Sequence, residues 1–242
     1  AVIPAEAFRT TTSSLGIPMP AFGRAGTAPT NLTGDHLPPA MKNAVTDMWT
    51  SLVGANAETR LIVRSSGLHE DGRDHSFAGL FESVADVRDP ASALNAVCRC
   101  WRSAWSPSLH EYAERHGLIG EVGMGLVIQH YQQALFGGVL FTRDPIGNRV
   151  SGELMICEMA RDSAAPVTDG GARPTRLILD RDTGALEVSG TDDLLPGQLA
   201  VLASRLVETG HKIETLLGGP ADVEWLWDGD RLWVVQARRL TV

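Results

Sequence analysis

Two acidic residues late in the sequence have the spacing of a metal-binding strand. Asp222 and Glu224 are two positions apart, and successive side chains of a strand alternate between its faces, so both carboxylates would project from one face. Val223, Trp225 and Trp227 would project from the other, apolar face. The pattern predicts an amphipathic strand that offers either a metal site or, as the plain alternative, a solvated acidic face.

A second strand is predicted to return from this one and to bring an amide beside the carboxylates. We predict a three-residue loop, 228–230, which pairs Asp222 with Gln236. That loop also places Glu224 on the same face as Gln236, whereas a two-residue loop would place them on opposite faces. Two carboxylates and one amide are oxygen ligands, which suit a hard cation such as Mg²⁺ carried in by a nucleotide.

An arginine near the end of a short apolar strand suggests a second kind of chemistry. Residues 60–65 (RLIVRS) predict a strand, and a polar stretch with several glycines follows it as far as Gly79. The guanidinium of Arg64, the hydroxyl of Ser65 and the backbone N–H groups of such a loop all match phosphate oxygens, which predicts a phosphate clamp. The alternative is a polar surface loop in which the arginine pairs with a local acid.

The elements that must position these residues follow from hydrophobic periodicity. Four helices are predicted, from about Leu37 to Gly54, from the N-cap Asp89 onward, from Pro107 to Gly117, and from Gly197 to Leu217. Period-two segments predict strands at 125–131, 138–142, 153–159, 177–179, 222–227 and 232–237. Residues 13–36 predict a loop. The predicted elements together give a chain that combines helices with a second half that is mainly sheet.

The composition excludes several classes of protein. The chain has 242 residues, of which 43% are apolar and 21% charged, so disorder is excluded. Its 21 Lys and Arg against 29 Asp and Glu give a net charge of −8, and we therefore expect no binding to nucleic acid or to a membrane surface. Three cysteines are too few for a disulfide framework, which predicts a cytoplasmic protein.

Four sequence blocks occur together and in a fixed order between about residue 60 and residue 242. The blocks are Val63-Arg64-Ser65-Ser66 with Glu70-Asp71 and Ser76-Phe77-Ala78-Gly79, then Gly138-Val139-Leu140-Phe141-Thr142-Arg143-Asp144-Pro145, then Asp222-Val223-Glu224-Trp225, and last Val235-Gln236-Ala237-Arg238. This combination resembles the ATP-binding domain of the phosphoenolpyruvate synthase and pyruvate phosphate dikinase family. The conjunction is far more specific than any single block.

The resemblance implies an ATP-grasp arrangement, in which two lobes hold ATP between them. The expected fold class is α+β, a two-lobed ATP-grasp-like domain with a mainly antiparallel sheet in its C-terminal half. The expected N-terminal lobe is residues 1–120, with the phosphate-clamp loop at 60–79. The expected C-terminal lobe is residues 121–242, with the metal-binding hairpin at 221–238.

The resemblance also implies roles for individual residues. Arg64 would bind the transferred phosphates and Arg238 would stabilise phosphoryl charge, so these two are the expected catalytic residues. Glu224 and Gln236 would hold Mg²⁺, and Asp222 would orient them or take a second ion. The expected contacts to ATP come from Arg64, Ser65, Gly79, Gln129, His130, Tyr131 and Thr142, of which 129–131 would line the adenine pocket.

Three differences from the family pattern shape the expected function. The chain is expected to start after a Gly-Gly-Lys segment, and neither Lys42 nor Lys212 matches its lysine. Residues 160–163 replace a Gly-Leu-Gly-Glu-like turn, and none of the seven histidines lies in the family's phosphohistidine motif. We therefore expect an ATP- and Mg²⁺-dependent phosphotransferase component that passes phosphate to a histidine on a separate partner. The alternatives are a degenerate nucleotide-binding module that regulates or scaffolds an assembly, and a stand-alone kinase of a small-molecule acceptor.

Overall fold

The computed structural model describes residues 1–23, 26–54, 56, 58–68, 80–144, 153–162, 174–184, 186–190 and 196–240. The chain divides into two compact units, Ala1–Tyr131 and Gln132–Val242. Each unit has its own sheet and its own apolar core. Every strand pairing in the described part of the chain is antiparallel, so the predicted combination of helices with antiparallel sheet is confirmed.

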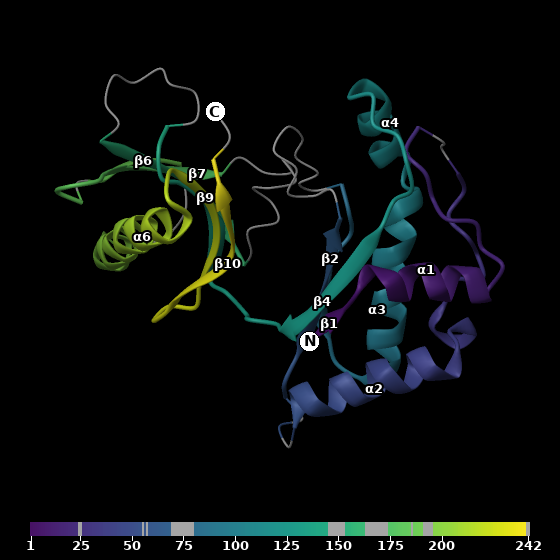
Figure 1. Cartoon of the computed structure of the whole chain (residues 1–242). Helices are drawn as coiled ribbons and strands as arrows, with labels where there is room; N and C mark the ends of the chain where they lie inside the picture. The colour runs from purple at the N-terminus through teal and green to yellow at the C-terminus, as the bar shows by residue number, and fades with distance from the viewer. Residues whose placement is uncertain are drawn as a thin grey trace. The chain divides into compact units, whose positions relative to one another are not determined.

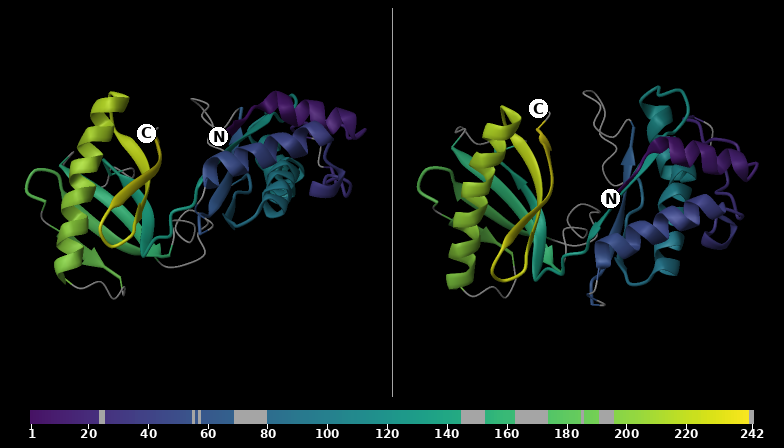
Figure 2. Two further views of the ribbon diagram at one scale, coloured as in Figure 1. Left: turned by 90° about the horizontal axis from the view of Figure 1, so that it is seen from below. Right: turned by 60° about the horizontal axis from the view of Figure 1, so that its bottom comes forward.

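The first unit packs helices on one face of a four-stranded sheet (Figure 1). The sheet has the order β1 (Val2–Ile3), β4 (Met124–His130), β2 (Leu61–Gly67) and β3 (Val84–Val87). The helices are α1 (Ala5–Ser14), α2 (Pro39–Val53), α3 (Pro90–Arg102) and α4 (Pro107–Arg115), with the short 3₁₀ turns η1 (Gly34–His36) and η2 (Ser103–Trp105). Figure 2 shows α1, α2 and α3 gathered on the same side of the sheet.

Local sequence signals place the predicted helices of this unit. The Asp89 carboxylate accepts a hydrogen bond from the Ser92 N–H at 2.8 Å, and a proline follows it at the first helical position of α3. Trp101 of α3 is fully buried, and its ring centroid lies 5.5 Å from that of Phe8. Helix α2 ends at Gly54, whose φ of 57° is readily adopted by glycine. Both predicted helices are confirmed.

The second unit packs one long helix on a six-stranded sheet (Figures 1 and 2). The strand order is β10 (Leu232–Arg239), β9 (Ala221–Trp227), β5 (Phe136–Phe141), β6 (Leu154–Arg161), β7 (Thr175–Asp180) and β8 (Leu186–Ser189). The helix is α6 (Pro196–Leu217), whose Leu202 and Leu206 are fully buried in the same core as Trp225. The face of β9 that carries Val223, Trp225 and Trp227 is therefore the helix-covered face, as the alternation predicts.

The sequence pattern alone could not assign one of the predicted strands to a sheet. The strand predicted at 125–131 is β4, which pairs with β2 and β1 and so belongs to the sheet of the first unit. A period of two identifies a strand but carries no information about its partner.

None of the described helices combines the length and the hydropathy that a membrane crossing requires.

Candidate functional site

The hairpin formed by β9 and β10 places the predicted metal ligands side by side. Gln236 lies directly opposite Glu224, and Arg238 lies directly opposite Asp222. At the turn, Trp227 pairs with Leu232, which leaves four residues, 228–231, in the loop. The predicted three-residue loop is therefore wrong, and so is the predicted pairing of Asp222 with Gln236.

A β-bulge restores the face that the turn alone would have reversed. The register shifts between Val234 and Gln236, so one extra residue of β10 lies between the two parts of the ladder. A four-residue loop without this bulge would put Gln236 on the face opposite Glu224. The prediction that the two side chains share a face is confirmed, but the bulge at Val235 is the reason.

The turn itself is fixed by the carboxylate of Asp228. One of its oxygens, Oδ1, accepts from the backbone N–H groups of Asp230 at 2.9 Å and Arg231 at 2.7 Å. The other, Oδ2, accepts from the indole N–H of Trp233 at 2.8 Å. The pKa of Asp228 is lowered, chiefly by the N–H of Arg231, so the ionised form that closes the turn is favoured.

The register continues from the hairpin across the rest of the sheet. Glu224 pairs with Val139 of β5, Val139 with Glu158 of β6, and Glu158 with Arg176 of β7. We call this line of side chains, from Gln236 to Arg176, the central row. It lies on the face opposite the α6 core, because its members alternate with the buried residues that pack on the helix.

Glu158 and Arg176 were not among the residues predicted for the site. The available signal was the segment ELMICEM, in which Glu158 interrupts an apolar strand at a position that faces away from its buried neighbours. The Nε atom of Arg176 is buried and has no hydrogen-bond partner in the described structure. An orphaned buried donor costs about 1–3 kcal/mol, so a bound acceptor on this face would relieve that cost.

An ion pair holds the next row of the hairpin. Arg238 donates to Oδ2 of Asp222 through Nε at 3.0 Å and through Nη2 at 2.8 Å. The Asp222 side chain is 14% exposed and that of Arg238 is 34% exposed. A charge-assisted pair of this kind fixes the direction of the guanidinium on the same face as the central row.

The donor set of the hairpin fits magnesium better than a permanently bound transition metal. The described residues contain no cluster of three or more His, Cys, Asp and Glu that could hold a metal ion. Asp222, Glu224 and Gln236 supply two carboxylates and one amide oxygen. Mg²⁺ usually keeps several waters and takes one or two carboxylates together with substrate phosphates, so this set fits a magnesium ion that arrives with a nucleotide.

In the first unit, the structure brings two of the predicted nucleotide contacts onto one face. Arg64 pairs with Val127 of β4, and Gln129 lies two residues further along that strand, so both side chains project from the same face. Their neighbours Val63 and Ile128 are buried in the helical core on the opposite face. Arg64 and Gln129 therefore share the sheet face that is turned away from the helices.

Two of the other residues predicted around them, Ser65 and His130, lie on the helical side of the sheet. Ser65 alternates with Arg64 and lies on the helical side of β2. The ring Nε2 of His130 lies 2.9 Å from the carbonyl oxygen of Leu52 at the end of α2, also on the helical side. The backbone N–H of Tyr131 donates to the carbonyl of Arg60 at 2.8 Å. Gly79 and the rest of the predicted loop at 69–79 lie outside the described residues.

Thr142, predicted beside the phosphates, is fully buried at the end of β5. Its hydroxyl accepts from the backbone N–H of Ala221 at 2.8 Å, and its own N–H donates to the Ala221 carbonyl at 2.9 Å. In the structure, this threonine joins the end of β5 to the start of β9.

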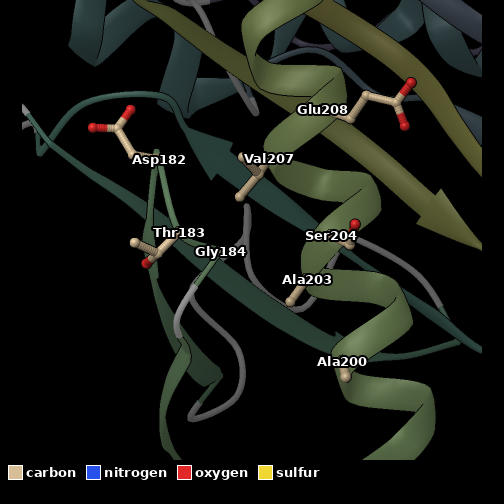
Figure 3. Close-up of a pocket in the computed structure, with 8 residues that line it drawn as sticks. All are labelled: Asp182, Thr183, Gly184, Ala200, Ala203, Ser204, Val207 and Glu208. Atoms are coloured by element: carbon tan, nitrogen blue, oxygen red, sulfur yellow. The ribbon is translucent and has the colours of Figure 1, made fainter.

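Two further features lie outside the central row. A hollow of about 480 Å³ lies between the turn after β7 and α6 (Figure 3). It is lined by Asp182, Thr183, Gly184, Ala200, Ala203, Ser204, Val207 and Glu208. None of these is a predicted site residue.

The three cysteines are buried and unpaired. Burial raises the pKa of Cys98 and Cys100 to about 12, so neither offers a thiolate nucleophile at neutral pH.

Comparison with known proteins gives one family. The model of the pyruvate phosphate dikinase AMP/ATP-binding domain matches residues 28–193. The chain is 31% identical over 211 residues to rifampicin phosphotransferase of Streptomyces sviceus, a match that covers 79% of this chain and 24% of that protein. It is 28% identical over 216 residues to phosphoenolpyruvate synthase of Pyrococcus furiosus, covering 76% and 26%.

A third relative is a transferase of another product. The chain is 26% identical over 204 residues to the prodigiosin synthesizing transferase PigC of Serratia marcescens, covering 75% of this chain and 22% of that protein. The chain thus spans about a quarter of the length of the curated relatives it matches.

Proposed function

The chain belongs to the family of the pyruvate phosphate dikinase AMP/ATP-binding domain, and from this membership we propose that it is an ATP- and Mg²⁺-dependent phosphotransferase component. Its phosphoryl acceptor would be a histidine on a separate partner. The observation that carries the proposal is the direct pairing of Glu224 with Gln236, next to the ion pair of Asp222 with Arg238. These are the family-like positions, and they share one sheet face.

The residues of the second unit would divide the work as follows. Glu224 and Gln236 would hold Mg²⁺, which when bound would neutralise charge on the phosphates. Asp222 would orient Arg238, whose guanidinium would stabilise the charge of the transferred phosphoryl group. The chemistry asks for positioning and charge neutralisation, and a hairpin held by backbone hydrogen bonds supplies both without covalent participation.

We propose that the two units are the two lobes of an ATP-grasp domain. In this proposal the first unit contributes Arg64 to the phosphates and Gln129 to the adenine pocket. Support comes from the family match, which spans parts of both units, and from the shared face of Arg64 and Gln129.

Nucleotide titration tests the proposal. Wild-type protein and Glu224→Gln are titrated with ATP in Mg²⁺ and in EDTA, with calorimetry or thermal shift as the readout. We expect Mg²⁺ to strengthen ATP binding to the wild type and to have little effect on Glu224→Gln. The matched control is Glu187→Gln, an exposed acid on β8 outside the central row, which should behave as the wild type. Absence of any ATP binding to the wild type would refute the proposal.

Turnover separates the proposal from its alternatives. ATP hydrolysis or ATP/AMP exchange that appears only when a phosphohistidine-domain protein is added would support the proposed acceptor. Binding without turnover would favour a degenerate regulatory module, which the replacement of the family's acidic turn at 160–163 motivates. Phosphorylation of a small molecule without any partner would favour a stand-alone kinase, the reading that the similarity to a rifampicin phosphotransferase motivates.

A further inference from the structure

A largely buried ion pair in the second unit joins the turn after β7 to α6. Arg181 donates to both carboxylate oxygens of Glu214, through Nη1 at 3.0 Å and through Nη2 at 2.5 Å. The two side chains are 12% and 15% exposed. Burial alone would raise the pKa of Glu214, but the hydrogen bonds and the charge of Arg181 outweigh it and lower that pKa, so the pair is ionised at neutral pH.

The ion pair is linked to the start of β9 through Thr142. Arg181, which binds Glu214, also donates to the carbonyl oxygen of Thr142. The same threonine holds both the N–H and the C=O of Ala221, at 2.8 and 2.9 Å. Ala221 immediately precedes Asp222, so one continuous chain of hydrogen bonds runs from Glu214 to the first residue of the candidate metal strand.

We call the region around Arg181, Glu214 and Thr142 the corner. Three other features hold α6 close to the sheet there. The ring Nε2 of His211, one helical turn before Glu214, lies 3.1 Å from the carbonyl oxygen of Arg181. A Cβ added to Gly210 would lie 2.8 Å from the sulfur of Met155, so α6 lies close to the sheet here and an alanine at this position would require the Met155 side chain to shift. Arg239 of β10 donates to the last carbonyl of α6, that of Leu217, at 2.6 Å.

Stability alone does not explain an ion pair in this place. The desolvation of two charges costs several kcal/mol per ion, and apolar residues of similar volume often serve stability equally well. What a fully hydrogen-bonded pair adds is a single geometry. This corner holds the side of the sheet from which β9 starts and at which β10 ends, where Asp222 and Arg238 lie.

We infer that Arg181 and Glu214 are positioning residues, which act through Thr142 and Ala221 to set where β9 delivers its metal-binding carboxylates. This inference rests on the proposed function. Neither residue touches the nucleotide in this scheme. Their effect is on the affinity of the hairpin for Mg²⁺, as expected for groups that orient metal ligands from behind.

The test compares Mg²⁺ affinity with metal-free ATP binding. We expect Glu214→Gln to lower the apparent Mg²⁺ affinity, measured at saturating ATP, by about tenfold or more. ATP binding in EDTA should change by less than about twofold, because the variant leaves the nucleotide contacts in place. The matched control is Glu208→Gln, which breaks a 2.6 Å ion pair with Lys212 on the same helix whose side chains are 55% and 69% exposed. It should leave Mg²⁺ affinity unchanged.

The hydroxyl of Thr142 provides a milder pair of variants if Glu214→Gln does not fold. Thr142→Ser keeps the hydroxyl and should retain wild-type Mg²⁺ affinity, whereas Thr142→Val should lose it as Glu214→Gln does. Equal loss of Mg²⁺-dependent and Mg²⁺-independent binding, or a lowered melting temperature with unchanged Mg²⁺ affinity, would overturn the positioning role.

Hydrogen exchange distinguishes failure of this inference from failure of the proposed function. Without any nucleotide, the backbone amides of Ala221 and Asp222 should exchange faster in Thr142→Val than in Thr142→Ser. If the wild type binds no ATP, the proposed function fails, but this measurement still decides whether the corner fixes β9. Identical exchange in both variants would refute the inference even if ATP binds.

Discussion

The two units differ in how firmly strand pairing fixes the distance between their candidate residues. In the second unit, Glu224 and Gln236 are direct cross-strand partners, so the backbone ladder itself sets the distance between them. In the first unit, Arg64 and Gln129 share a face, but they lie in different rows of the β2–β4 pair. The proposed metal ligands of the second unit are thus fixed by register, whereas the proposed phosphate contact of the first unit depends on one long arginine side chain.

The comparison shows why the same chemistry needs two kinds of support. A pair of metal ligands must be held within a fraction of an ångström, which strands achieve better than loops. A phosphate clamp tolerates more movement, because a guanidinium can reach its acceptor through several rotatable bonds. If this distinction is correct, variants of the second sheet should fail through geometry, and variants of the first should fail through charge.

The largest expected effect is a failure of geometry in the second unit. A Cβ added to Gly138 of β5 would meet the carbonyl oxygen of Glu158 and would lie 2.9 Å from the Cα of Met159. We expect Gly138→Ala to destabilise the protein by about 3 kcal/mol, because backbone rather than a flexible side chain must move. Chemical denaturation measures the loss, and hydrogen exchange should place it in β5 and β6 and not in β2 and β4.

The control for this prediction is another glycine of the same unit. Gly197→Ala, in the first turn of α6, meets no atom within 4 Å and should be neutral or slightly stabilising. Equal stability of the two variants would show that the second sheet tolerates movement of the backbone beside the central row, and the distinction between the units would lose its basis.

The hairpin shows how far sequence reasoning could reach. The alternation of Asp222 and Glu224 with apolar residues determined which face each strand presents, because burial on one side enforces a period of two. The loop length and the bulge at Val235 were not predictable. One extra residue in the loop and one extra residue in the bulge each reverse the face of Gln236, so together they leave it on the face that the alternation predicts. Only the pairing of actual strands distinguishes a three-residue loop from a four-residue loop followed by a bulge.

The remaining differences have the same physical origin. The short strands β3 and β8 and the helix α1 were not predicted, because four-residue strands and a helix rich in threonine and serine carry weak periodic signals. The opposite faces of Gln129 and His130 follow directly from alternation once β4 is paired with β2. The place of Glu158 and Arg176 in the central row is visible only from the register across four strands, which no local pattern contains.

The second prediction tests the charge-based failure expected of the first unit. Removing the guanidinium in Arg64→Met should weaken ATP binding by about 2 kcal/mol, or roughly thirtyfold, as for the loss of a hydrogen bond to a charged group. The Mg²⁺ dependence of the remaining binding should be unchanged, opposite to the pattern expected of Glu224→Gln. Arg60→Met is the control, because that side chain pairs with Asp86 at 3.2 Å. A changed Mg²⁺ dependence in Arg64→Met would contradict the separate roles proposed for the two units.

The third prediction sharpens the comparison within the second sheet. Arg176→Met removes the buried Nε donor that has no partner in the described structure, so the free protein should be as stable as the wild type or slightly more stable. If a nucleotide supplies the missing acceptor, ATP affinity should fall by about 1 kcal/mol, or roughly fivefold. Calorimetry with ATP and denaturation without it measure both quantities. Loss of stability without loss of affinity would assign this arginine to the fold alone.

The smallest effect concerns the core of the first unit, which contains a buried titratable group. His110 of α4 is 1% exposed, and neither ring nitrogen has a hydrogen-bond partner in the described structure. Burial lowers the pKa of His110, against a weaker opposing effect of Glu114. Between this lowered pKa and the ordinary value near 6.5, the unfolded chain binds more protons than the folded one, so stability falls as the pH falls.

We therefore expect acidification from pH 7.5 to 6.0 to destabilise the first unit by at most about 1 kcal/mol through this histidine. His110→Leu should remove that part of the pH dependence, because it replaces two unpartnered nitrogens with apolar atoms in an apolar core. His116→Gln, at the exposed end of the same helix, should retain it. Urea midpoints across this range, combined with hydrogen exchange in α4 and in α6, measure the effect. An acid-induced loss confined to α6 would place the pH sensitivity in the second unit and would contradict the assignment to His110.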